Sequence, residues 1–219
     1  MLKSLFLILI LFSCQTYEFE DEFHFLALGD SYTIGESVAE NVRWPNQLAR
    51  KINESNSTVR IIAKTGWTTD ELISAIQDAN IKKQYNLVSL LIGVNNQYRG
   101  WSIETFESEL QELIEIAISF SKKGSSNLII LSIPDWSAFP FAEGRDIKKI
   151  SSEIDDFNAV VKSAAHKNGV AFFDVTDISR LASKQPELIA EDLLHPSGEM
   201  YRLWVEKIIN SKEFQEIDF

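Results

Sequence analysis

Short apolar runs alternate with longer amphipathic segments along most of this chain. Five runs of apolar or β-branched residues have the length and composition of buried parallel strands. They span Phe23–Leu28, Val59–Ile62, Leu87–Ile92, Leu128–Ile133 and Val170–Phe173. Five other segments place apolar residues at helical spacing, so we predict helices there. They span Trp44–Asn53, Thr69–Ala79, Ser102–Ser121, Ser151–Asn168 and Ser197–Asn210.

This alternation predicts an α/β fold, a three-layer α/β/α sandwich around a five-stranded parallel sheet with right-handed crossovers. Open sheets of this kind bind ligands beyond the carboxyl ends of their strands. Ser31, Gly66 and Asn95 follow the first, second and third predicted strands. We therefore expect these residues to meet at one edge of the sheet.

The first residues of the chain are predicted to lie outside the folded domain. Residues 1–13 consist of a basic start followed by an apolar run. The run is shorter than the roughly 20 apolar residues that a membrane-spanning helix needs, so we predict that it is a signal peptide. Cys14, the only cysteine, follows Leu-Phe-Ser, which resembles a bacterial lipoprotein signal. The resemblance implies lipid on Cys14, an acidic tether over 14–22, and a domain over 23–219 held at the cell envelope outside the cytoplasm. An ordinary secretory signal and a lone buried cysteine are the alternatives.

Charge and cysteine content narrow the possible partners. The 219-residue chain carries a formal net charge of −11. This acidic balance argues against nucleic acid, which requires a basic face. A single cysteine excludes an intramolecular disulfide.

The chain also contains the parts of a serine nucleophile system. Ser31 follows the first strand, but a serine is a weak nucleophile without a base. Of the three histidines, His24 lies on an apolar strand and His166 near a helix end, where structural roles suffice. His195 remains as the base, and Asp192 three residues earlier can orient its ring. A helix cap or a surface pair is the alternative for Asp192 and His195.

An oxyanion hole needs preorganised hydrogen-bond donors. The backbone N–H of Ser31, the backbone N–H of Gly66 and the side-chain amide of Asn95 can supply them. Taken singly, Gly66 could be a turn glycine and Asn95 part of a strand-end turn.

Four ordered sequence blocks carry these residues: Gly29-Asp30-Ser31, Gly66, Gly93-Val94-Asn95 and Asp192-Leu193-Leu194-His195. In this order they resemble the SGNH, or GDSL-type, hydrolase superfamily. The resemblance implies a flavodoxin-like sandwich, no metal and no organic cofactor. It also implies Ser31 as nucleophile, His195 as base and Asp192 as its partner, with Ser31, Gly66 and Asn95 forming the oxyanion hole.

Two positions beside these motifs need separate interpretation. The third block of the superfamily often continues with an aspartate, where this chain has Asn96, and we expect a change in the hydrogen bonding behind Asn95. Asp30 is adjacent to the nucleophile and therefore points the wrong way to orient His195. We expect Asp30 to hold the turn through its side chain.

Aromatic residues are frequent in the loops at the same sheet edge, and they could line an apolar or sugar-stacking cleft. The candidate substrate-binding residues are Trp67, Tyr98, Trp101 and Trp136, with Arg99, Phe139 and Phe141 nearby. The alternative is that these rings only pack the loops. The leading hypothesis is a serine esterase acting on a small ester. A carbohydrate O-acetyl esterase with the same machinery and a non-catalytic envelope binding lipoprotein are the alternatives.

Overall fold

The computed structural model describes residues 22–219, so the expected signal peptide and Cys14 lie outside the described residues. The strands are β1 (Phe23–Gly29), β2 (Ser57–Ala63), β3 (Leu87–Leu91), β4 (Leu128–Leu131) and β5 (Ala171–Phe173). The α-helices are α1 (Ser31–Ile34), α2 (Trp44–Ile52), α3 (Thr69–Asp78), α4 (Val94–Tyr98), α5 (Ile103–Ser119), α6 (Ile147–Lys167), α7 (Thr176–Ser179), α8 (Gly198–Ile209) and α9 (Lys212–Gln215). Short 3₁₀ helices include η3 (Trp136–Ala138) and η4 (Pro140–Ala142).

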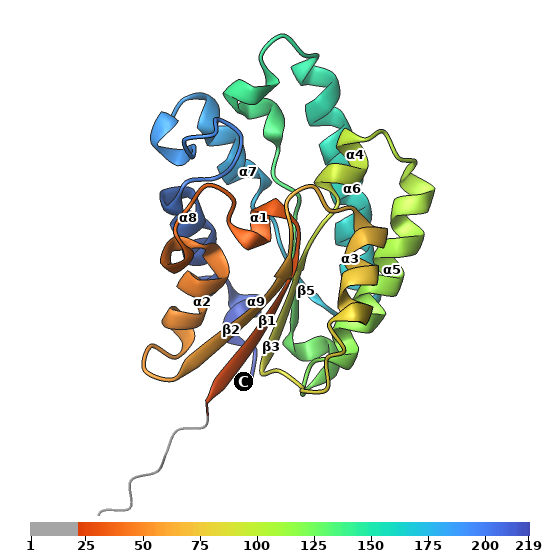
Figure 1. Ribbon diagram of the computed structural model, residues 1–219, viewed down its shortest axis with the longest axis vertical. Helices are drawn as coiled ribbons and strands as arrows, with labels where there is room; N and C mark the ends of the chain where they lie inside the picture. The colour runs from red at the N-terminus through yellow and green to blue at the C-terminus, as the bar shows by residue number, and fades with distance from the viewer. Residues whose placement is uncertain (1–21) are drawn as a thin grey trace, which may run out of the picture.

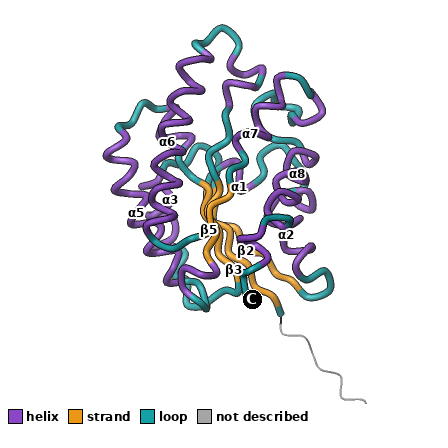
Figure 2. Tube along the Cα trace, turned by 180° about the vertical axis from the view of Figure 1, so that it is seen from behind, coloured by secondary structure: helices purple, strands orange, loops and turns teal. Residues whose placement is uncertain are grey.

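The strands form one parallel sheet in the order β2-β1-β3-β4-β5. Helices α3, α5 and α6 cover one face, and α2 and α8 cover the other (Figures 1 and 2). This arrangement confirms the predicted α/β sandwich. The chain runs from β1 outward to β2 and then returns past β1 to β3, so strand order reverses between β1 and β3. Such a switch point is where open α/β sheets place ligands.

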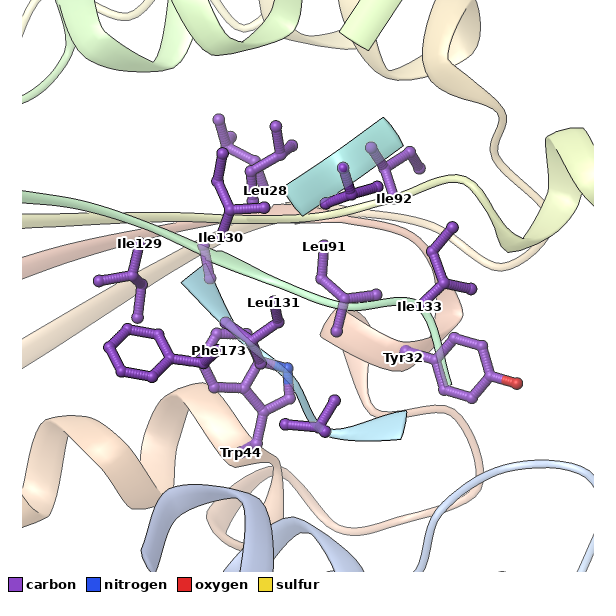
Figure 3. Close-up of a cluster of buried hydrophobic side chains, with 14 of the residues drawn as sticks. Leu28, Tyr32, Trp44, Leu91, Ile92, Ile129, Ile130, Leu131, Ile133 and Phe173 are labelled. Carbon is purple, nitrogen blue, oxygen red and sulfur yellow. The ribbon is translucent and has the colours of Figure 1, made fainter. Parts of the chain in front are cut away.

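The core explains why the sequence shows continuous apolar runs. Every residue of β3 and β4 is buried, because helices cover both faces of the central strands. Trp44 of α2 is fully buried and packs beneath the strands (Figure 3). Its ring centroid lies 6.1 Å from that of Phe25. The sheet is thus a rigid platform for the loops that follow its strands.

Most predicted boundaries hold within a few residues, and the exceptions have local causes. Helix α6 begins four residues earlier than predicted, because the side chain of Asp146 accepts a hydrogen bond from the Lys149 N–H and caps the helix there. The side chains of Thr68 and Glu71 form a capping box at the start of α3. Within residues 22–219, no helix combines the length and apolar character that a bilayer span requires.

Candidate active site

Ser31 begins helix α1 directly beyond the end of β1. The turn is held by Asp30, whose Oδ1 accepts a hydrogen bond of 3.0 Å from the Tyr32 N–H, as expected from the sequence. Asp30 is fully buried, and this burial raises its pKa to about 7 against the opposing effect of the Tyr32 hydrogen bond. Ser31 itself is 4% exposed.

Asp192 and His195 lie on the loop that leads into α8. His195 Nδ1 is 2.6 Å from Asp192 Oδ2. Asp192 Oδ1 accepts hydrogen bonds from the backbone N–H groups of Leu194 (3.0 Å) and His195 (2.9 Å), which close the turn between the two side chains. Burial alone would raise the pKa of Asp192, but the hydrogen bonds it accepts outweigh burial and lower the pKa to about 2. Asp192 therefore presents a carboxylate to the ring.

Two further contacts fix this pair, and neither was predicted. Ser37 Oγ donates a hydrogen bond of 2.6 Å to Asp192 Oδ2, from a loop residue with φ of 63°. The ring of Tyr32 meets the His195 imidazole edge to face, with centroids 5.6 Å apart. Tyr32 could have been suspected from its place beside the nucleophile. Ser37 lies far from Asp192 in the sequence and gave no signal.

The groups expected to donate in an oxyanion hole keep unused hydrogen-bonding capacity. Gly66 occupies the third position of a turn closed by a 3.2 Å hydrogen bond from the Trp67 N–H to the Lys64 carbonyl, and its φ of 88° suits a glycine in a type II turn. Among the described residues, no group accepts a hydrogen bond from the N–H of Ser31 or Gly66. Asn95 Nδ2 donates to the Trp67 carbonyl at 2.9 Å, which leaves its second N–H available.

Asn96, the departure from the superfamily pattern, has a defined role behind Asn95. It is fully buried, its Oδ1 accepts a 3.2 Å hydrogen bond from the Thr69 N–H, and its Nδ2 donates a 2.7 Å hydrogen bond to Thr69 Oγ1. The amide thus joins α4 to the first residue of α3 through both of its polar atoms. A carboxylate could accept at this position but could not donate.

One pocket of about 170 Å³ unites these groups. It is lined by Ser31, Tyr32, Thr65, Gly66, Val94, Asn95, Tyr98, Trp136, Phe141, Leu194 and His195. The lining brings together the expected nucleophile, base and oxyanion donors, while Asp192 lies behind His195. Val94 and Leu194 belong to the quoted sequence blocks but were not predicted to line a pocket, and neither was Thr65, which precedes Gly66.

Three rings form the aromatic wall of this pocket: Tyr98, Trp136 and Phe141. Trp136 is buried and its Nε1 donates a 2.9 Å hydrogen bond to Gln97 Oε1, whereas Tyr98 and Phe141 are 47% and 40% exposed. The Arg145 guanidinium lies 5.1–5.4 Å from all three ring centroids, within the range of cation–π attraction. The wall is therefore fixed at its base by Gln97 and at its rim by Arg145.

Trp67 and Trp101, also expected at the substrate site, are not among the residues that line this pocket. The side chain of Trp67 packs against the hydrophobic core, and its backbone carbonyl accepts the hydrogen bond from Asn95. Trp101 lies in a separate groove beside α5 and α6, with Ile103 and Phe157. The hydrogen bond from the Trp101 N–H to the Asn96 carbonyl ends α4 and turns the chain away from the pocket.

The site contains few groups suited to a metal. In the part of the chain that the structure describes, no three side chains of His, Cys, Asp or Glu converge. The chemistry that the geometry offers is that of a nucleophile, an oriented imidazole and a set of N–H donors.

Comparisons with known proteins find relatives in sequence and in fold. The chain is 23% identical over 206 residues to an arylesterase of Vibrio mimicus, covering 92% of this chain and 93% of the relative. A lipolytic G-D-S-L protein of Veillonella parvula DSM 2008 has a similar structure, with a TM-score of 0.70 and 18% identity over 87% of this chain and 98% of that one. Axe2, an acetylxylan esterase of Geobacillus stearothermophilus, follows with a TM-score of 0.66 and 20% identity over 90% and 94%. The model of the GDSL-like lipase/acylhydrolase family matches residues 27–203, and the chain belongs to this family of ester hydrolases.

Proposed function

We propose that this esterase acts through an acyl-enzyme on Ser31. As Ser31 Oγ attacks the ester carbonyl carbon, His195 Nε2 takes the hydroxyl proton and then passes it to the departing alcohol oxygen. A water molecule attacks the acyl carbon in turn, with His195 again accepting the proton. The acid is released and Ser31 Oγ recovers its proton.

The observation that supports this proposal best is the 2.6 Å contact of His195 Nδ1 with Asp192 Oδ2, in a histidine that shares its pocket with Ser31. A carboxylate at Nδ1 holds the proton on that nitrogen and leaves Nε2 unprotonated as the base. The carboxylate also stabilises the imidazolium that forms during attack.

The tetrahedral intermediate carries a negative oxygen that needs donors. We assign this role to the N–H groups of Ser31 and Gly66 and to the free N–H of Asn95. Removing one donor of this kind costs about 2.7–4 kcal/mol of transition-state stabilisation in measured enzymes.

The pocket supports an ester with a short acyl chain. Its volume is about 170 Å³, and an engineered cavity of about 150 Å³ accommodates benzene. A group of about six carbon atoms therefore fills it. The exposed rings of Tyr98 and Phe141 at the rim favour an alcohol that stacks. A carbohydrate O-acetyl ester is for this reason the second candidate, as in the acetylxylan esterase of similar fold.

The proposal is tested with p-nitrophenyl acetate, butyrate and octanoate and with acetylated xylo-oligosaccharides, using the wild type beside Ser31→Ala. We expect turnover of acetate and butyrate well above octanoate, loss of turnover in Ser31→Ala, and labelling of Ser31 by a fluorophosphonate. Turnover that survives in Ser31→Ala contradicts the mechanism. Lack of both turnover and labelling in the wild type favours the binding-protein alternative.

We also propose that lipid on Cys14 anchors the domain to a membrane of the cell envelope. The support is the sequence of the first residues alone. Cys14→Ser should leave the protein unprocessed or soluble, and unchanged membrane fractionation contradicts the anchor.

A further inference from the structure

The turn that carries Gly66 is held by two side chains of one short helical segment. Asn95 Nδ2 donates to the Trp67 carbonyl, and Arg99 Nη2 donates to the adjacent Gly66 carbonyl at 2.6 Å. Asn95 and Arg99 are four residues apart, so they share one face of α4 and its C-terminal cap. Two consecutive peptide carbonyls of the turn are therefore bound by the same element.

The guanidinium of Arg99 is itself held in place. Arg99 Nη2 lies 3.2 Å from Glu71 Oε2. The same carboxylate oxygen accepts a 2.9 Å hydrogen bond from the Thr68 N–H at the start of α3, and this bond, together with the Arg99 charge, lowers the pKa of Glu71. Arg99 thereby connects α4, the Gly66 turn and the cap of α3.

Besides these two bonds, the turn is attached by the Trp67 side chain, which packs against the hydrophobic core. Residues 64 and 65 are exposed, and the Thr65 hydroxyl bonds to Glu36 on another loop. Gly66 has no side chain, so its own packing cannot fix the direction of its N–H. An added Cβ at Gly66 would meet only Arg99 Nη2, at 3.9 Å. The contacts from α4 are therefore the ones that join the Gly66 and Trp67 carbonyls of the turn to the helix that carries Asn95.

We infer that Arg99 is a positioning residue for the oxyanion hole, which keeps the Gly66 N–H directed at the same point as the Asn95 amide. The inference rests on the proposed function, because two donors from separate loops stabilise one oxygen only when both are aimed at it. The Arg99 and Glu71 side chains are 43% and 39% exposed, so solvent screens the ion pair and its contribution to stability is small. The effect of Arg99 is therefore on catalytic geometry rather than on folding.

The test compares Arg99→Met, Arg99→Lys and Glu71→Gln, with Arg202→Met as the matched control. Arg202 is similarly exposed and pairs with Glu199 and Glu206 on α8, outside the pocket lining. Displacement of a catalytic group by about 1 Å costs up to about 100-fold in rate, so we expect kcat of Arg99→Met to fall about 10- to 100-fold with KM nearly unchanged. The inhibition constant of a trifluoromethyl ketone should rise by a similar factor, because its adduct bears the oxyanion.

Arg99→Lys, which can still donate to the Gly66 carbonyl, should recover much of kcat. Glu71→Gln should lower kcat less than Arg99→Met does, since the amide oxygen can still accept hydrogen bonds from the Thr68 N–H and from Arg99. Thermal unfolding should be equal in Arg99→Met and Arg202→Met. A kcat for Arg99→Met equal to that of Arg202→Met overturns the inference, and so does a loss of kcat without weaker inhibitor binding. If Arg99→Met does not fold, Arg99→Gln takes its place. The inference is then overturned if Arg99→Gln does not show the same paired change in kcat and inhibition constant. Lack of Ser31-dependent turnover in the wild type overturns the proposed function first, and this inference with it.

Discussion

Asp30 allows a quantitative test, because it buries a carboxyl group that is costly to ionise. No group in the described residues pairs with its Oδ2. The substitution Asp30→Asn keeps an oxygen for the Tyr32 N–H and removes the ionisation. It therefore imitates the protonated acid at every pH.

The magnitude follows from the pKa shift. Burial raises the pKa of Asp30 from 3.8 to about 7, and each unit corresponds to about 1.4 kcal/mol. At a pH between these two pKa values, Asp30 of the folded chain holds a proton that the unfolded chain has released. The free energy of unfolding contributed by this group is therefore greatest below pH 4 and falls as the pH rises toward 7. The whole effect is about 4 kcal/mol, of which about 3 kcal/mol falls between pH 5 and pH 8.

The assay is urea unfolding of the wild type and Asp30→Asn at pH 5 and pH 8. From pH 5 to pH 8, we expect the free energy of unfolding of Asp30→Asn to rise by about 3 kcal/mol relative to that of the wild type. Taking the difference between the proteins removes the titration of all other groups. Asp78→Asn, which removes a charge from an exposed site, controls for net charge. A stability difference between the two proteins that does not change with pH would refute the reasoning. A carboxyl group that ionises as easily in the folded chain as in the unfolded chain makes no pH-dependent contribution to the free energy of unfolding.

Three further predictions concern the pocket, and steady-state kinetics with p-nitrophenyl acetate checks the first two. Asp192→Asn should reduce kcat by about 10⁴-fold, since an amide stabilises the wrong imidazole tautomer, and activity within tenfold of the wild type would remove Asp192 from the mechanism. Asn95→Ala should reduce kcat by about 10²- to 10³-fold, and an unchanged kcat would exclude Asn95 as an oxyanion donor. Trp136→Phe should lower the free energy of unfolding by about 1–3 kcal/mol in urea titrations, because Gln97 Oε1 loses its buried partner, whereas Trp136→Tyr is the control that keeps a donor group.

The fold could be predicted because the hydrophobic pattern of each strand and long helix is visible within a short, continuous stretch of sequence. Each strand contains a short, mainly apolar run, and the long helices α3, α5 and α6 repeat their apolar residues over several turns. Helices α1 and α4 have four and five residues, which is about one turn, and no periodicity can be seen over that length.

The candidate site could be predicted only as far as its residue types are chemically distinctive. Ser31 and His195 could be chosen as candidates because few side chains can act as nucleophile and base. Ser37 and Arg99 were not assigned roles, because each acts through a contact with a loop far away in the sequence. The aromatic residues show the same limit, since a tryptophan such as Trp101 serves equally well for packing or for a pocket wall.

The attachment of the Gly66 turn implies that activity and fold need not be lost together. The turn is fixed by hydrogen bonds, by an exposed ion pair and by the packing of Trp67, and it follows the half-buried edge strand β2, whereas the central strand β3 is fully buried. Segments that bury little apolar surface open at a lower free energy than the core of the same protein. On heating or in mild urea, the oxyanion donors should therefore lose their alignment while the sheet is still intact. Inactivation would then precede unfolding and reverse on cooling, so that the working temperature is set by one turn rather than by the whole domain.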